Sequence, residues 1–181
     1  MFKLLWFQHL PKISIDLVKW TPFIKNDWFR QHYMKFVYVL QIIIFLLMSN
    51  FLYTWFNSVD IYILIFIGIL VFIFHEFLHI VVVKKEGNIS LTFRGMFFWI
   101  HTDAVLSKAR FWIFMTLPLI VLSVMPAIAS FFVSGNLQSI LLFVSGLNLL
   151  ISASDIINSF LIFIKPKNSL FFRGYYRVEK N

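Results

Sequence analysis

The chain has 181 residues, of which 60% are hydrophobic, and it carries a formal charge of +8 at pH 7. A soluble domain is usually about 45–50% apolar, so this chain has more apolar surface than a core of its size can bury and needs lipid as its solvent. In such a chain, the excess of Lys and Arg indicates membrane topology and contact with anionic lipid rather than binding to nucleic acid. No cysteine is present, which excludes disulfides, thiolate metal ligands and cysteine-protease chemistry.

The first 35 residues are a mixture of basic and aromatic side chains, which favours an arm at the membrane interface, partly helical. Four apolar runs follow, and each is long enough to cross a bilayer as a helix. They cover residues 36–56, 61–83, 111–133, which holds Pro118 and Pro126, and 137–164. The predicted fold is an all-α multi-pass membrane protein. It has an arm, a domain of four transmembrane helices and a basic tail, over residues 1–35, 36–165 and 166–181.

The 16 basic residues fall into three groups: before the first run, between the second and third, and after the fourth. The other two connections, around residues 57–60 and 134–136, have none. By the positive-inside rule, both termini and the loop of residues 84–110 lie in the cytoplasm. Four spans fit this alternation without exception.

The loop of residues 84–110 contains two β-prone runs, residues 89–93 and 96–100, with Arg94 and Gly95 between them as a turn. We expect either a short hairpin that dips into the interface or an aromatic-rich interfacial loop. A hairpin with a free edge would offer a place for an extended peptide to add as a strand.

The most specific motif lies inside the second run, where residues 75–79 read His-Glu-Phe-Leu-His, an HExxH box. Two histidines four residues apart share one helix face, so His75 and His79 can hold one zinc ion with Glu76 beside it as a base. The alternative is a pair of polar residues that bond between helices. An ionisable group at the bilayer centre costs about 2.5–3.5 kcal/mol on insertion scales, which argues against polar groups that serve no function there.

Catalytic zinc usually takes three protein ligands and a water, so a third ligand is needed at the same depth. Asp155 in the fourth run is the candidate. His75 lies nine residues before the first lysine of the loop, and Asp155 lies ten residues before the first lysine of the tail. At about 1.5 Å per residue, both lie roughly 13–15 Å above the cytoplasmic charges. The alternative for Asp155 is an acid that hydrogen-bonds between packed helices.

Other polar residues offer further candidates. His101 and Asp103 are rival ligands, but they would have to fold back from the loop into the membrane. Asn148, Ser152 and Asp155 share a helix face, because they are spaced by four and three residues. Asn148 is a candidate donor to a developing oxyanion, and Ser152 is a candidate to orient the Asp155 carboxylate. Ordinary polar packing between helices explains these two equally well.

Together these motifs resemble those of a known family. An HExxH box in one span, followed by Asn148-x-x-x-Ser152-x-x-Asp155 in the last, is similar to the small bacterial membrane proteins named "putative zincin peptidases". That family is distantly related to the site-two intramembrane metalloproteases. The resemblance covers roughly residues 60–165.

The resemblance implies a zinc-dependent intramembrane metalloprotease in the plasma membrane of a bacterial cell. It places Zn²⁺ on His75, His79 and Asp155, with Glu76 as the base. The expected partners are the lipid bilayer and a membrane-embedded or membrane-associated peptide whose peptide bond is hydrolysed. The alternative is a non-catalytic metal-binding membrane protein that acts as a regulatory or immunity partner.

Overall fold

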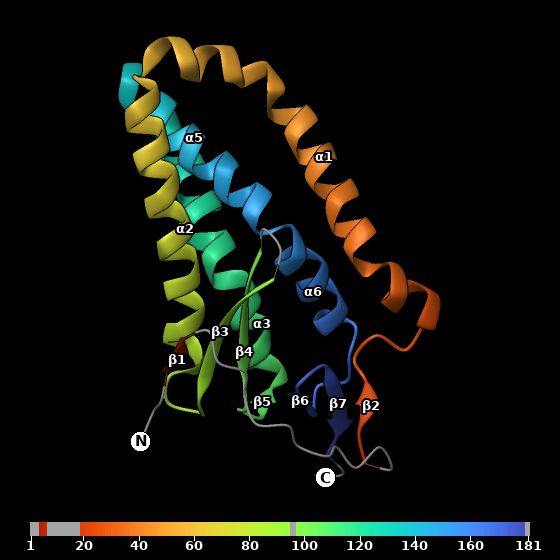
Figure 1. Ribbon diagram of the computed structural model, residues 1–181. Helices are drawn as coiled ribbons and strands as arrows, with labels where there is room; N and C mark the ends of the chain where they lie inside the picture. Colours follow the sequence, from red (N-terminus) through yellow and green to blue (C-terminus); the bar gives the residue numbers. More distant parts are fainter. Residues whose placement is uncertain (1–3, 7–18, 95–96, 180–181) are drawn as a thin grey trace.

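The chain is mostly helical in the computed structural model, which describes residues 4–6, 19–94 and 97–179 (Figure 1). The predicted turn residue Gly95 and much of the predicted N-terminal arm lie outside the described residues.

Six α-helices form within the described part of the chain. They are α1 (Asp27–Ser58), α2 (Ile61–Val83), α3 (Lys108–Leu119), α4 (Met125–Ala129), α5 (Gly135–Ile151) and α6 (Ala153–Phe163). A π-helical turn, Ile120–Val124, joins α3 to α4, and a 3-10 turn, Ser130–Phe132, follows α4.

Three helical segments of the described chain are long and apolar enough to cross a membrane, namely Asp27–Ser49, Ile61–Val83 and Lys108–Phe132. The pair α5 and α6, which meet at a bend of 62°, makes a fourth crossing if it counts as one span. The prediction of a membrane protein built from apolar helices is confirmed to this extent, with three to four candidate spans.

Helix α2 buries both histidines on one face and exposes large apolar side chains on the other. Its buried residues follow one stripe of the helix: Leu64, Val71, His75, His79 and Val83. Its exposed residues are aliphatic and aromatic: Ile61, Tyr62, Ile63, Ile65, Phe66, Ile69, Ile73, Phe74 and Phe77. Many exposed apolar side chains suit a helix that is solvated by lipid on one face and packed against protein on the other.

Helix α1 begins nine residues before the predicted run, at Asp27 rather than residue 36. The side-chain Oδ1 of Asn26 accepts a hydrogen bond from the Phe29 N–H at 2.9 Å, which satisfies a free donor of the first turn. The Arg30 side chain also donates to Asp27 Oδ1 at 2.6 Å. Hydropathy alone misses this polar first turn, because its residues form a helix without being apolar.

Strands form two small sheets, so the fold is mostly helical rather than all-α. One sheet has the order β1-β3-β4, in which β1 (Leu4–Trp6) pairs parallel with β3 (Ile89–Arg94) and β3 pairs antiparallel with β4 (Phe97–Thr102). The other has the order β2-β7-β6-β5 and is antiparallel throughout. Its strands are β2 (Thr21–Pro22), β5 (Leu106–Ser107), β6 (Ser169–Phe172) and β7 (Tyr175–Val178).

The β6–β7 hairpin forms within the segment that was predicted as a basic tail. Arg173 and Gly174 connect its strands with φ of 46° and 80°, and two positive φ values match the twist of a tight hairpin. Phe171 and Tyr176 on this hairpin pack with Phe23 and with Ile162 of α6 in one hydrophobic cluster. The second sheet therefore anchors the end of α6 (Figure 1).

Two lysines make hydrogen bonds around the C-terminal end of α6. Lys108 Nζ donates to Phe163 O at 2.8 Å and to the carbonyl of Lys165, so it satisfies carbonyls that end the helix. Lys165 Nζ donates to Phe23 O at 2.8 Å and lies 4.4 Å from the centre of the Tyr176 ring. Burial lowers the pKa of Lys165.

The bend between α5 and α6 lies at Ser152, and α1 supplies side chains that satisfy carbonyls beside it. Gln41 Nε2 donates to Leu150 O at 3.1 Å, and the Tyr33 hydroxyl donates to Ser154 O at 3.2 Å. Without water in a bilayer core, backbone groups near a helix break need such partners from neighbouring helices. The bend therefore depends on α1, and it sets the direction in which α6 begins.

Candidate metal centre

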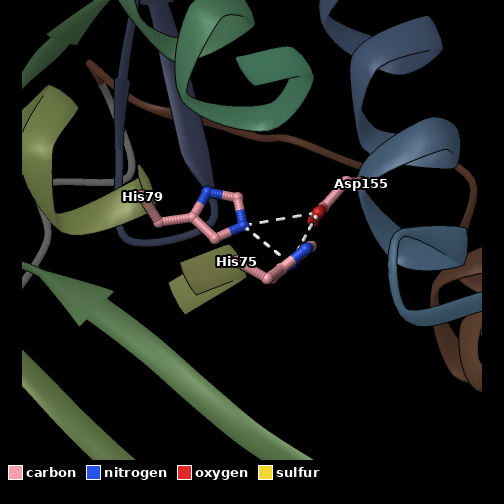
Figure 2. A group of neighbouring side chains, drawn as sticks. All are labelled: His75, His79 and Asp155. Carbon is pink, nitrogen blue, oxygen red and sulfur yellow. Dashed lines mark hydrogen bonds and ion pairs between the residues drawn. The ribbon is translucent and has the colours of Figure 1, made fainter. Parts of the chain in front are cut away.

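Three side chains from two helices converge at one buried point (Figure 2). Helix α2 contributes His75 and His79, which are 3% and 5% exposed, and α6 contributes Asp155, which is 7% exposed. The two Nε2 atoms are 3.2 Å apart, and each lies 3.3 Å from Asp155 Oδ2. The structure thus brings together the three residues that the sequence singled out as candidate ligands.

The orientation of His75 is set by Asn148 of α5. His75 Nδ1 lies 2.9 Å from Asn148 Oδ1. The other end of the amide, Nδ2, donates to Pro118 O at 3.0 Å and to Ser123 Oγ at 2.8 Å. Because a carbonyl oxygen only accepts, the nitrogen of the amide must face Pro118 and the oxygen must face His75. His75 therefore donates from Nδ1.

The orientation of His79 is set by a backbone carbonyl of α3. His79 Nδ1 lies 2.7 Å from Phe114 O, and this oxygen can only accept, so His79 also donates from Nδ1. The Phe114 ring packs against the imidazole, with 4.5 Å between the ring centres. In a neutral imidazole that carries its proton on Nδ1, Nε2 has a free lone pair.

The consequence is that three lone pairs face one another inside the protein. With both histidines protonated on Nδ1, the 3.2 Å contact between the Nε2 atoms joins two acceptors and is not a hydrogen bond. Asp155 Oδ2 is buried and has no hydrogen-bond partner among the described residues. Three converging acceptors without a shared donor repel one another, so the arrangement calls for a cation at the centre.

The spacing of the three atoms also suits a metal ion. Ligand atoms about 2.0–2.1 Å from a tetrahedral zinc ion lie about 3.3 Å from one another. The three separations of 3.2, 3.3 and 3.3 Å agree with this distance. Two imidazoles and a carboxylate are a usual donor set for catalytic zinc, with a fourth position left for water. The residues present therefore fit such an ion.

Glu76 stands beside these three groups without belonging to them. It follows His75 directly on α2, and its side chain is half-buried. Its carboxyl group interacts electrostatically with His75, His79 and Asp155. A carboxylate near a metal position but outside the ligand set is available to accept a proton.

The other predicted residues are placed differently. Ser152 Oγ lies 3.3 Å from Asn148 Nδ2. Asp103, a rival ligand, lies outside the described metal-binding group and accepts hydrogen bonds from Asn88 N at 2.6 Å and Asn88 Nδ2 at 2.8 Å. The backbone of His101 lies in β4, and its side chain falls outside the described part of the chain.

Reasoning from the sequence missed the groups that α3 and the π-helical turn contribute. These are the carbonyls of Phe114 and Pro118 and the hydroxyl of Ser123. Every residue has a backbone carbonyl, so the sequence does not show which carbonyl accepts from a histidine. Pro118 is the one visible signal, because a proline inside an apolar helix marks a carbonyl four residues earlier that has lost its helical donor.

Comparison with known proteins agrees with this geometry. The family model described as "Putative zincin peptidase" matches residues 68–170, which is more than half of the chain. The chain belongs to this family. The zincin peptidase match spans all three converging residues together with Glu76, and its name implies a zinc cofactor and a metallopeptidase activity. No curated protein and no solved structure matches the chain.

Proposed function

We propose that this zincin peptidase is a zinc-dependent intramembrane metalloprotease that hydrolyses peptide bonds of membrane-embedded or membrane-associated peptides. The observation that carries the proposal is the convergence of two Nε2 lone pairs and one carboxylate oxygen within helices that are apolar enough to span a membrane. The family match supports the peptidase chemistry.

His75, His79 and Asp155 would hold the ion. Zinc, when bound there, supplies a Lewis acid and makes a water molecule acidic enough to attack near neutral pH. Glu76 accepts the proton of that attacking water and then passes it to the nitrogen of the leaving amine, so no net proton is lost or gained by the enzyme. The Nδ1–H groups of both histidines keep donating to Asn148 Oδ1 and Phe114 O throughout.

Asn148 is better suited to positioning than to an oxyanion hole. It is fully buried, and its Nδ2 already donates to Pro118 O and Ser123 Oγ. We therefore assign it the orientation of His75, the role that outer partners of metal-bound histidines commonly have. Ser152, through its contact with the same amide, supports this arrangement.

The depth of the site supports cleavage in one half of the bilayer. His75 and Asp155 each lie eight residues before the last residue of their helix, at Val83 and Phe163. This separation corresponds to about 12 Å along a helix axis. Since lysines follow both helix ends, we place this half on the cytoplasmic side of the plasma membrane.

A peptide in a membrane must unwind before its carbonyls can be attacked, because a helix keeps them hydrogen-bonded. β4 is an edge strand of the sheet β1-β3-β4. We propose that it pairs with the unwound substrate, since strand addition satisfies the backbone of an extended peptide.

The test is zinc content together with turnover in purified protein. We expect one zinc per wild-type chain in detergent, and its loss in His75→Ala and Asp155→Ala. His32→Ala is the matched control, because His32 lies in α1 and bonds to Trp28 O outside the metal-binding group. A wild-type protein that binds no zinc after exposure to the ion would refute the site.

Glu76→Gln separates binding from chemistry. The variant should keep the zinc and lose cleavage of membrane peptides, because the amide cannot accept the proton. Comparing the membrane proteome of cells that carry the wild type with that of cells that carry Glu76→Gln would identify the substrate. Normal cleavage by Glu76→Gln would refute the base, and zinc binding with no peptide accumulating in the variant would favour the non-catalytic alternative.

A further inference from the structure

We propose that Pro118 is the positioning residue that sets the tautomer of the metal-site histidine His79, and that its carbonyl supports the tautomer of His75 through Asn148. This inference rests on the proposed function only in taking His75 and His79 as zinc ligands. Pro118 is almost wholly buried in α3 and is not one of the three converging residues. Because Pro118 has no N–H, the carbonyl of Phe114 is free to accept from His79. The carbonyl of Pro118 accepts from Asn148, which in turn contacts His75.

The effect on His79 follows from helix geometry. In an α-helix, the N–H of residue 118 would donate to the carbonyl of residue 114. Proline has no N–H, so the Phe114 carbonyl loses this donor. Phe114 O is the atom that accepts from His79 Nδ1 at 2.7 Å. A freed carbonyl in a membrane helix needs a partner from a neighbouring helix, and here the partner is the imidazole of His79.

The effect on His75 passes through Asn148. Pro118 O accepts from Asn148 Nδ2 at 3.0 Å, and the same Nδ2 reaches Ser123 Oγ at 2.8 Å in the π-helical turn that follows α3. Both contacts hold the nitrogen of the amide away from α2. Asn148 Oδ1 is thereby left to accept from His75 Nδ1 at 2.9 Å.

The two effects together have one outcome. Each imidazole is held with its proton on Nδ1 and its Nε2 lone pair directed at Asp155 Oδ2. An alanine at position 118 would return an N–H to the helix and compete with His79 for the Phe114 carbonyl. His79 would then be free to adopt the tautomer with its proton on Nε2, which cannot bind a metal through that atom.

The experiment compares alanine with lactic acid at position 118. Lactic acid, introduced by nonsense suppression, has the side chain of alanine but an ester oxygen in place of the N–H. Pro126→Ala is a control for losing a proline from the same span, because Pro126 lies at the start of α4. The first readout is the ¹⁵N chemical shift of the His79 ring nitrogens in metal-free protein, assigned by their absence in His79→Ala.

We expect His79 to be protonated on Nδ1 in the wild type, in the lactic acid variant and in Pro126→Ala, and to shift towards Nε2–H in Pro118→Ala. The second readout is zinc affinity by competition with a chelator. It should fall about 10–100-fold in Pro118→Ala alone, the range for loss of an outer partner.

Three results would overturn the inference: wild-type His79 protonated on Nε2, an unchanged His79 signal in Pro118→Ala, or a lactic acid variant that behaves like alanine. If Pro118→Ala fails to fold, the lactic acid variant still tests the inference, because it lacks the proline ring as well as the N–H, and a His79 signal shifted towards Nε2–H in that variant would overturn the inference. A wild type that binds no zinc would refute the proposed function, whereas the ¹⁵N signals would still decide the role of Pro118.

Discussion

His75 Nε2 and Asp155 Oδ2 lie 3.3 Å apart although 80 residues separate them in the chain. Each residue stands eight positions before the end of its helix, so α2 and α6 present them at matching heights. This contact joins the HExxH helix to α6, the second helix of the bent pair, and the candidate metal site depends on both.

Asp155→Asn should remove tight zinc binding while leaving the shape of the site. The amide has the same size as the carboxyl group, but it lacks the negative charge that Asp155 Oδ2 offers next to both Nε2 atoms. Because Asp155 is a proposed ligand, zinc affinity should fall by more than the roughly 10–100-fold that follows the loss of an outer partner. Chelator competition measures the affinity, and Asp103→Asn is the control. Wild-type affinity in Asp155→Asn would assign Asp155 to helix packing instead.

Asn148→Leu should weaken both zinc binding and the fold. The change removes the acceptor for His75 Nδ1 and leaves Pro118 O and Ser123 Oγ without their shared donor. We expect zinc affinity to fall about 10–100-fold. The free energy of unfolding should fall by about 1–3 kcal/mol for each buried group left unsatisfied.

The control for Asn148→Leu is Asn158→Leu. Asn158 accepts from the Tyr33 hydroxyl at 3.0 Å and lies outside the metal-binding group. Its replacement should lower stability while zinc affinity stays at the wild-type value. Equal losses of affinity in both variants would show that Asn148 acts only through stability.

Tyr33→Phe should destabilise the bend between α5 and α6. The phenylalanine ring fills the same space but cannot donate to Ser154 O or Asn158 Oδ1. We expect a loss of about 1 kcal/mol in the free energy of unfolding, measured by denaturation in detergent. Tyr62→Phe, at a position that is 78% exposed, should leave stability unchanged. A Tyr33→Phe protein as stable as the wild type would show that α1 does not support the bend.

The absence of native cysteine allows a clean test of topology. Single cysteines introduced at Asn136 and Lys167 should react differently with a thiol reagent that cannot cross membranes. In intact cells we expect labelling at position 136, where the connection carries no basic residue, and none at position 167, which lies in the basic C-terminal segment. Both positions should react after the membrane is opened. The reverse pattern would contradict cytoplasmic termini.

Much of the architecture was predictable because it depends on local properties of the chain. Apolar runs long enough to cross a bilayer indicated helices, and the structure contains three to four candidate spans. The resemblance to the zincin peptidases, carried by the HExxH box and the residues around Asp155, is confirmed by the family match.

The bend at Ser152 and the sheet β2-β7-β6-β5 were not predicted. Residues 137–164 are apolar enough on average to be predicted as one span, whereas the carbonyls beside the break accept from Gln41 and Tyr33 of a helix far away in sequence. The β6–β7 hairpin turns at Arg173-Gly174, which is a weaker turn signal than Asn-Gly or Asp-Gly.

The sequence by itself determined that His75 and His79 share a helix face, and it predicted that Asp155 stands at the same height, because helix rise and periodicity follow from residue number alone. Only the tertiary structure decided which nitrogen of each ring faces the metal position. That choice depends on the Phe114 carbonyl and the Asn148 amide, which reach the histidines from two other helices. A backbone carbonyl is present at every residue, so only the packed fold shows which one is free to bind.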